Sequence, residues 1–142
     1  MIEKYNKEKD FLKKVENPDD ETNKREILNK EQIEMLLEKY PKVPQDYISY
    51  LQEIGSGNFR EGQFKVHSSL FNLEDLGLED HYELQSNIWF FGDNYCGDFS
   101  GFDFNEENGN VVEFWHESGE LHYTNTSFQT YIRTQMLMDE KY

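Results

Sequence analysis

The sequence is poor in the features that mark secreted, membrane-spanning or nucleic-acid-binding proteins. Its single cysteine, Cys96, excludes an intramolecular disulfide and a cysteine-based zinc site. No run of 18 apolar residues occurs and no N-terminal stretch resembles a signal peptide, so no transmembrane helix is predicted. Only 14 residues are basic against 29 acidic ones, and the net charge of −15 repels nucleic acid and anionic membranes. These absences predict a cytoplasmic protein with neither a nucleic-acid nor a membrane partner.

The acidic charge is concentrated in one part of the chain. Residues 1–30 carry eight basic and eight acidic side chains, whereas residues 61–142 carry three basic and sixteen acidic ones. A field of that sign steers basic partners toward the protein, although it also promotes plain solubility. The acidic part of the chain therefore leaves two interpretations open, a surface for a basic protein and a merely solvated surface.

Aromatic residues make up 15% of the chain, and they are densest in residues 88–104, IWFFGDNYCGDFSGFDF. The first four residues of this stretch are all apolar, which is typical of a strand that is buried on both faces. The GDN that follows is a turn signal, because glycine and asparagine tolerate positive φ. The alternation that resumes at Phe99 predicts a second strand. We therefore expect the core to form around this hairpin.

Amphipathic patterns predict helices before and after the hairpin. Asn29 and Gln32 have the spacing of a capping box at the start of one helix, and Gly55 suits the left-handed end of the next. The last helix is predicted to begin at a capping box of Thr126 and Gln129. The predicted helices span residues 1–16, 29–40, 44–54 and 126–136.

Strand patterns fill most of the remaining chain, and turn signals such as Asn108-Gly109 separate them. The order of elements predicts an α+β fold: a mostly antiparallel sheet of about five or six strands with helices packed on one face, N-terminal helices and a C-terminal helix. We expect a single domain over residues 1–142, with an N-terminal helix and loop in residues 1–28 and a core in residues 29–136. The predicted strands span residues 64–70, 88–91, 99–104, 111–116 and 121–124; residues 17–28 and 55–58 are predicted loops, residues 71–76 a short helical turn, and residues 77–87 are assigned to no element.

Three segments of the sequence occur in an order and spacing that resemble a known family. They are LEKYPKVPQDYISYLQEIGSG at residues 37–57, WFFGDNYCGDFSGFDF at residues 89–104 and VVEFWHESGELHYTNTSFQTYI at residues 111–132. Together they resemble the SUKH superfamily, which includes the Smi/Knr-type proteins, over residues 27–136. The sequence departs from the family pattern at Val43-Pro44, where Leu-Pro is usual.

The resemblance implies a binding protein rather than an enzyme. Many bacterial members of the superfamily look like immunity proteins, which neutralise a cognate toxin delivered between cells. Such toxins are frequently nucleases or nucleic-acid deaminases. Fungal members are instead regulatory interaction proteins. The resemblance therefore implies an immunity-type protein, and a regulatory scaffold module of the same fold is the alternative.

Three carboxylates in residues 88–104, Asp93, Asp98 and Asp103, are candidates for a metal or acid–base site. Such a site needs carboxylates that converge, and the spacing of five residues does not match a calcium loop. Turn-forming carboxylates that bond the backbone are the favoured interpretation. We expect no catalytic, metal or cofactor site, and a metal-assisted hydrolase that uses Asp93, Asp98 and a histidine is kept as an alternative.

The histidines and the cysteine show no catalytic spacing. No H-E-x-x-H pattern occurs, and His116 and His122 are interpreted as a polar surface pair across the last hairpin. Neighbouring acidic residues disfavour a thiolate at Cys96, which is interpreted as a small buried side chain.

Acidic turns with exposed rings remain as the candidate partner-binding surface. Loops carry binding more often than sheet faces do, and negative charge complements a basic nuclease. A few desolvated aromatic side chains would supply most of the affinity. The alternative for each carboxylate is that it only solvates a turn. The predicted partner-binding residues are Asp93, Tyr95, Asp98, Glu106, Glu107, Glu117 and Glu120; no oligomeric state is predicted.

Overall fold

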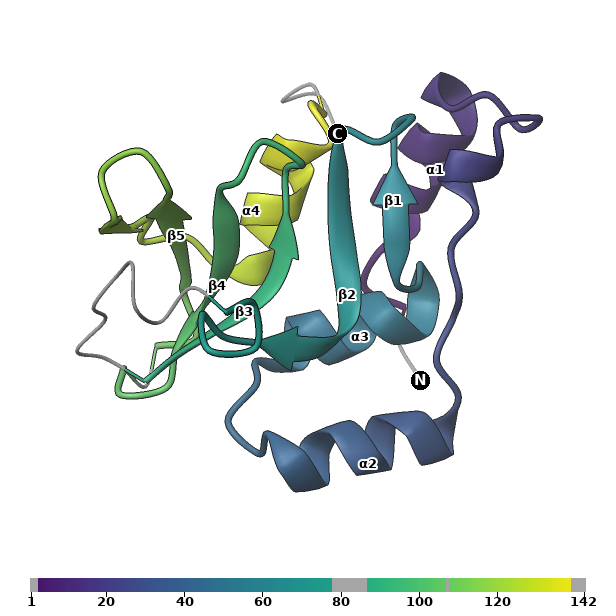
Figure 1. The fold of residues 1–142 in the computed structure, drawn as a ribbon. Coiled ribbons are helices and arrows are strands. Elements are labelled where there is room, and N and C mark those ends of the chain that lie inside the picture. The colour runs from purple at the N-terminus through teal and green to yellow at the C-terminus, as the bar shows by residue number, and fades with distance from the viewer. Residues whose placement is uncertain (1–2, 78–86, 107, 139–142) are drawn as a thin grey trace.

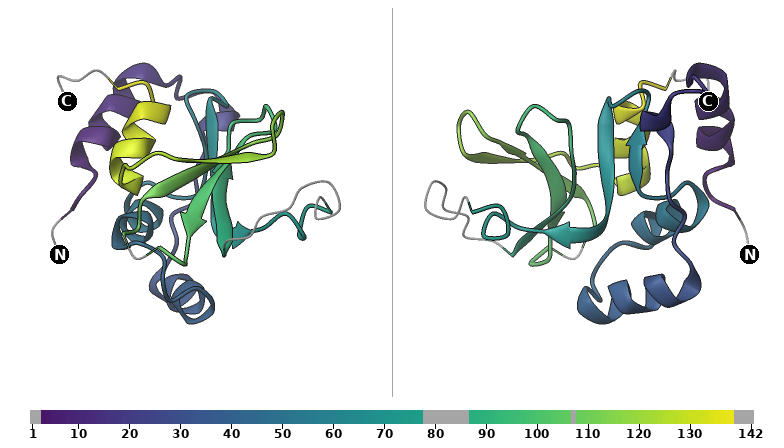
Figure 2. Two further views of the ribbon diagram at one scale, coloured as in Figure 1. Left: turned by 90° about the vertical axis from the view of Figure 1, so that its left-hand side faces the viewer. Right: turned by 45° about the vertical axis from the view of Figure 1, so that its right-hand side comes forward.

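In the computed structural model, helices cover one face of an antiparallel sheet (Figures 1 and 2). The structure describes residues 3–77, 87–106 and 108–138. The predicted α+β class, the sheet of about five or six strands, and the N-terminal and C-terminal helices are confirmed. The helical elements are α1 (Asn6–Val15), η1 (Glu21–Asn23), α2 (Lys30–Lys39), α3 (Gln45–Glu53) and α4 (Phe128–Gln135). The strands are β1 (Gly57–Phe59), β2 (Phe64–Phe71), β3 (Ile88–Asp93), β4 (Phe99–Asp103), β5 (Val111–Trp115) and β6 (Glu120–Tyr123).

The strands lie in the sheet in the order in which they follow one another in the chain, and each pairs antiparallel with its neighbour. Because consecutive antiparallel strands join at alternate ends of a sheet, the connections at residues 60–63, 94–98 and 116–119 share one end. β4 and β5 join at the other end. β3 continues through Asp93, so the turn predicted at residues 92–94 lies at residues 94–98 instead.

The sheet is apolar on both faces. Phe90 and Phe91 are adjacent and fully buried, but they belong to two separate clusters of buried side chains. The ring of Phe91 lies 4.9 Å from that of Phe128 in α4, within the helix-covered core. The ring of Phe90 lies 5.3 Å from that of Phe99, on the opposite face. The prediction of a strand buried on both faces is confirmed.

The N-terminal helix is part of the helix-covered core. Tyr5 is fully buried and its hydroxyl donates to the backbone oxygen of Asp46 at 2.7 Å. Phe11 and Leu12 join the same cluster as the buried residues of α3 and α4. Burial of these side chains removes apolar area from water, which favours the docking of α1 by about 25 cal/mol per Å². Within the described part of the chain, no helix is long and apolar enough to cross a membrane.

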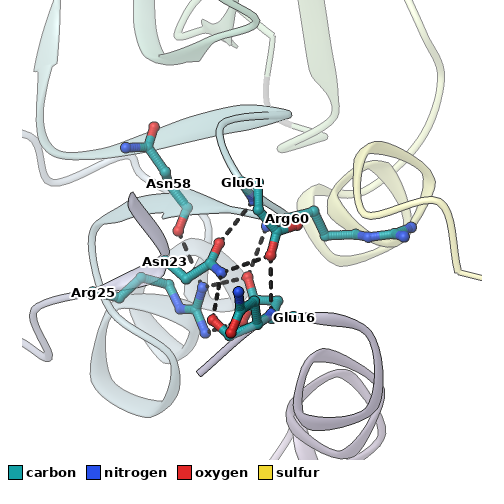
Figure 3. Close-up of polar contacts among 7 residues, drawn as sticks. Glu16, Asn23, Arg25, Asn58, Arg60 and Glu61 are labelled. Atoms are coloured by element: carbon teal, nitrogen blue, oxygen red, sulfur yellow. Dashed lines mark hydrogen bonds and ion pairs between the residues drawn. The ribbon is translucent and has the colours of Figure 1, made fainter. Parts of the chain in front are cut away.

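A polar cluster fixes the segment after α1 against the turn between β1 and β2 (Figure 3). Nη1 and Nη2 of Arg25 each donate to Glu16 at 2.8 Å, and the backbone N of Arg60 donates to Glu16 at 2.7 Å. Asn23 and Glu61 exchange two further hydrogen bonds at 2.7 and 2.9 Å. Arg60 and Glu61 have φ of 48° and 56°, a left-handed conformation that costs free energy for residues other than glycine. The cluster therefore stabilises a strained turn.

Two of the predicted helix signals are confirmed and one is wrong. Asn29 and Gln32 form both hydrogen bonds of the capping box that begins α2. Gly55 follows α3 with φ of 103°, as its left-handed role predicts. The last helix begins one residue later than expected, because the Ser127 side chain accepts from the backbone N of Thr130.

Two predicted loops contain regular structure. Residues 57–58 of the expected loop 55–58 belong to β1, which pairs with β2. The expected loop 17–28 contains η1 and a bridge between Glu26 and Ser56, so it forms part of the sheet border. Phe71 ends β2, so the short helical turn predicted at residues 71–76 is shifted: the structure has a turn at residues 73–77, with backbone hydrogen bonds between residues three apart. Residues 78–86, most of the unassigned segment 77–87, lie outside the described residues.

Candidate partner-binding site

The turn between β3 and β4 lies beside the turn between β5 and β6, at one end of the sheet. Most of the predicted site residues lie at this end. Phe99 pairs with Phe114, so the residues before β4 lie beside those after β5. Asp98 Oδ1 accepts a hydrogen bond from the backbone N of His116 at 3.1 Å and lies 2.8 Å from Nδ1 of the same histidine. We call residues 94–98 and 116–119 the paired turns. Asp98 therefore connects the two turns, because its side chain contacts both the backbone N and the ring of His116.

Local hydrogen bonds determine the conformation of the first paired turn. Asp93 Oδ1 accepts from the backbone N of Tyr95 at 3.0 Å, and Asn94 Oδ1 accepts from that of Cys96 at 2.9 Å. Tyr95 has φ of 67° and 54% of its surface is exposed. Its hydroxyl contacts Oδ1 of Asn58 in β1. The turn therefore presents the Tyr95 ring to solvent from a fixed backbone.

The polar cluster of Figure 3 reaches this turn through Asn58. The backbone oxygen of Asn58 accepts from Nη1 of Arg25 at 3.1 Å, and its side chain meets the Tyr95 hydroxyl. Arg25 is in turn held by both carboxylate oxygens of Glu16. A chain of hydrogen bonds thus connects the segment after α1 to the paired turns. The N-terminal part of the chain positions the site without forming it.

Each aspartate of the site faces its own histidine. Oδ2 of Asp93 lies 3.0 Å from Nε2 of His67 in β2, whereas Asp98 lies beside His116. Burial alone would raise the pKa of both carboxyl groups, but hydrogen bonds from the histidine and from the backbone outweigh it and lower both. Asp103 Oδ1 likewise accepts from the backbone N of Asn105 at 2.9 Å. The predicted role of these carboxylates, bonding the backbone of turns, is confirmed.

The lowered pKa of Asp93 predicts an acid-sensitive contribution to stability. A carboxyl group whose pKa is lower in the folded than in the unfolded state stabilises the fold above its unfolded pKa of about 3.9. That contribution is lost as the pH falls through the folded pKa. We expect the free energy of unfolding of Asp93→Asn to depend less on pH between about 5 and 2 than that of the unmodified chain, in urea titrations. Identical slopes for the two proteins would contradict the assignment.

An exposed aromatic pair on the β5–β6 hairpin adds to this surface. Trp115 ends β5 with 44% of its surface exposed, and its ring stacks on that of His122 with centroids 3.5 Å apart. Beneath the hairpin, the Tyr131 hydroxyl of α4 donates to Glu113 at 2.7 Å and lies 2.5 Å from Oγ of Ser100. Burial raises the pKa of the Tyr131 hydroxyl, which keeps it a hydrogen-bond donor. This anchor ties β5 to α4.

The Trp115–His122 pair was not predicted as a site feature. Alternation along the strand places Trp115 on the same side as Glu113, whose carboxylate accepts from Tyr131 of α4, so the spacing alone does not predict an exposed ring. The expected pairing of His116 with His122 is wrong. His122 lies opposite Glu113, and His116 contacts Asp98. Cys96, expected to be buried, is exposed because it sits at the tip of the first paired turn.

The structure separates the predicted partner-binding residues into two groups. Glu117 lies in the second paired turn and Glu120 directly follows that turn at the start of β6; both are exposed. They share one end of the sheet with Tyr95 and Asp98 of the first paired turn and with Asp93, which directly precedes it. Glu106 is exposed at the opposite end of the sheet, beside a small depression lined by Asp103 and Tyr123. Glu107 lies outside the described residues. The residues that share one end are Asp93, Tyr95, Asp98, Glu117 and Glu120.

Carboxylates and histidines do not gather as a metal site within the part of the chain that the structure describes: no three His, Cys, Asp or Glu side chains converge there. Asp93 faces His67 of β2, whereas Asp98 faces His116 in the second paired turn. The described residues of the site form an acidic surface with the exposed rings of Tyr95 and Trp115, an arrangement that suits recognition of another molecule.

The family of the chain follows from comparison with known sequence families. The model of the SMI1 / KNR4 family (SUKH-1) matches residues 27–134. The chain belongs to the SMI1/KNR4 family. No match was found among curated proteins or among solved structures. In this SMI1/KNR4 protein the paired turns lie within the matched region, whereas α1 and Arg25 precede it. The polar cluster thus joins a segment outside the family match to the region inside it.

Proposed function

We propose that this SMI1/KNR4 protein is a non-enzymatic immunity protein of the cytoplasm. It binds a cognate toxin domain, a basic nuclease or nucleic-acid deaminase, and covers its active site with the paired turns and the adjacent Trp115. Membership of a family with immunity-type members supports a protein partner. The observation that carries the location is the fixed turn end, where acidic residues and exposed rings lie together.

The physical basis of the proposed binding is complementarity of charge and shape. Glu117 and Glu120 are exposed and would accelerate encounter with a cationic surface. Tyr95 and Trp115 expose about half of their surfaces, while the backbone N of Tyr95 donates to Asp93 and the backbone oxygen of Trp115 accepts from Gly119. A rigid aromatic anchor loses little conformational entropy on binding, so such residues dominate the affinity of many interfaces. Occlusion of a phosphate-binding active site would then stop the toxin without any bond being made or broken.

Co-expression with the product of a neighbouring toxin gene tests the proposal. We expect the protein to relieve growth arrest caused by that toxin and to bind it in a pull-down. A regulatory scaffold, the alternative function, would have no toxin gene beside it and would relieve no toxicity. The proposal is wrong if no adjacent toxin is neutralised and none is bound.

Charge-matched variants locate the interface. Glu117→Lys with Glu120→Lys, and separately Trp115→Ala, are each expected to weaken toxin binding by about thirtyfold or more, as loss of a binding hot spot does. The control is Glu31→Lys with Glu34→Lys, which makes the same charge change on exposed positions of α2. Isothermal calorimetry measures all three affinities. Equal weakening by the control would show that net charge, and not the paired turns, governs binding.

A further inference from the structure

A groove with the opposite charge character runs between α2 and the outer side of β2. It consists of two adjoining depressions, of about 430 and about 250 Å³, that share Ser68. The larger one lies between the segment at residues 24–26 and β2, and the smaller one lies between α2 and residues 68–69. The groove is separate from the paired turns, because none of the residues that line it lies in either turn.

The floor of the groove is a stretch of β2 that leaves the regular sheet. Val66 of β2 pairs with Gly92 of β3, and the next pair along β2 is Phe71 with Phe90. Between these two pairs β2 therefore has several residues, whereas β3 has one. Two tyrosines hold this stretch from behind: the Tyr47 hydroxyl donates to the backbone oxygen of His67 at 2.8 Å, and Tyr40 donates to that of Leu70 at 3.3 Å. The stretch is therefore fixed, and the serines at its centre are exposed.

Lysines dominate the charge of the groove. Three lysines, Lys24, Lys39 and Lys65, line the groove. Among its described lining residues, Glu26 is the one that carries a carboxylate. Arg25 also lines the groove, but Glu16 already engages its guanidinium. The ion pair of Lys24 with Glu21 is highly exposed and so weakly held.

The acidic residues of α2 are not among the residues that line the groove. Gln32, Met35 and Lys39 recur at the spacing of one helix face and line the smaller depression. Glu31, Glu34 and Glu38 recur on another face of the same helix, and none of them lines the groove. The charged residues that line the groove are therefore mostly basic, on a strongly acidic protein.

An exposed apolar side chain lies at the smaller depression. Met35 has 65% of its surface exposed, next to the buried Leu36 and Tyr40 that line the same depression. Exposed methionine is frequent on surfaces that bind peptides, because its unbranched, polarisable side chain adapts to its partner. The groove thus offers cations along its length and an apolar contact at one end.

We propose that the groove between α2 and β2 binds an extended acidic peptide segment of a protein partner, with an apolar residue of that segment against Met35. The two adjoining depressions and the exposed Ser68 and Ser69 at the floor suit an extended chain. The lysines that line the groove complement the carboxylates of such a segment. The protein therefore has two recognition surfaces of opposite charge preference.

Peptide titration tests this second surface. One probe is a fluorescein-labelled dodecapeptide of four Glu-Glu-Leu repeats, and the other is the corresponding peptide of four Lys-Lys-Leu repeats. Each peptide is added to the protein of residues 1–142 while ¹H–¹⁵N spectra are recorded. We expect the acidic peptide to bind and to shift the amide signals of Met35, Ser68 and Ser69. Binding should weaken at least tenfold in Lys24→Glu with Lys39→Glu, and also in Met35→Asp. The control, Lys7→Glu with Lys13→Glu, makes the same charge change on α1 and should leave binding unchanged.

Other outcomes overturn the proposal. Absence of binding, equal binding of the basic peptide, or amide shifts confined to other surfaces would each do so. Self-association in analytical ultracentrifugation that Lys24→Glu with Lys39→Glu abolishes would identify a second copy as the occupant and would also overturn it. Toxin neutralisation is expected to survive these groove substitutions, so failure here leaves the proposed immunity function intact.

Discussion

Replacing Glu16 with alanine is expected to lower the free energy of unfolding by about 3 kcal/mol. The carboxylate of Glu16 accepts two hydrogen bonds from Arg25 and one from the backbone N of Arg60. Its removal leaves a largely buried guanidinium without its counter-ion and releases a strained turn. Urea denaturation followed by circular dichroism measures the change.

The control for this variant is an acidic residue of the same type in an exposed ion pair. Glu21→Ala removes the partner of Lys24, and both side chains of that pair are more than 70% exposed. Its effect should stay below about 1 kcal/mol. Similar losses in the two variants would contradict a structural role for the polar cluster. Glu16→Ala should also alter the amide environment of Tyr95 through Asn58, which Glu21→Ala should not.

Phe91→Ala is expected to have the largest effect on stability, a loss of about 3–5 kcal/mol. The Phe91 ring is fully buried and contacts the rings of Phe102 and Phe128 at 5.0 and 4.9 Å. Truncation leaves a cavity between β3 and α4 that these rings cannot fill. A typical domain is stable by only about 5–15 kcal/mol, so this variant approaches the limit of folding.

A second variant keeps the test measurable if Phe91→Ala does not fold. Phe91→Leu preserves most of the apolar volume and should cost less than about 1.5 kcal/mol. Met35→Ala is the control, since that apolar side chain is largely exposed and its loss should change stability by about 0.5 kcal/mol or less. A small effect of Phe91→Ala would mean that the core does not depend on the helix-covered face.

Short-range signals predicted the elements that depend on neighbouring residues. The capping box of Asn29 and Gln32 is complete within four residues, so the sequence suffices to locate it. Thr126 and Gln129 carry an equally good signal, yet Ser127 caps α4. The backbone oxygen of Thr126 accepts from the backbone N of Val111 at 2.9 Å, which places Thr126 at the border of β5. A contact between residues far apart in the chain thus overrides the local pattern.

The same distinction explains why the site was only partly predictable. The acidic turns and Tyr95 follow from composition and turn signals, and the structure gathers five of the seven predicted residues at one end of the sheet. Asp98 and His116, however, meet because Phe99 pairs with Phe114, and this register is not encoded by any spacing within one turn. The strand β1 was missed for a similar reason, since three residues become a strand only beside β2 and Glu26.

The strand order has a consequence for synthesis of the protein. Each strand pairs with the one made just before it, so hairpins can form one after another as the nascent chain leaves the ribosome. The aromatic face that α4 covers nevertheless stays open until residues 128–136 have emerged, because Phe128, Ile132 and Met136 close it. If a ribosome stalled before this last helix was made, the apolar face of the sheet would stay exposed and could associate with other polypeptides.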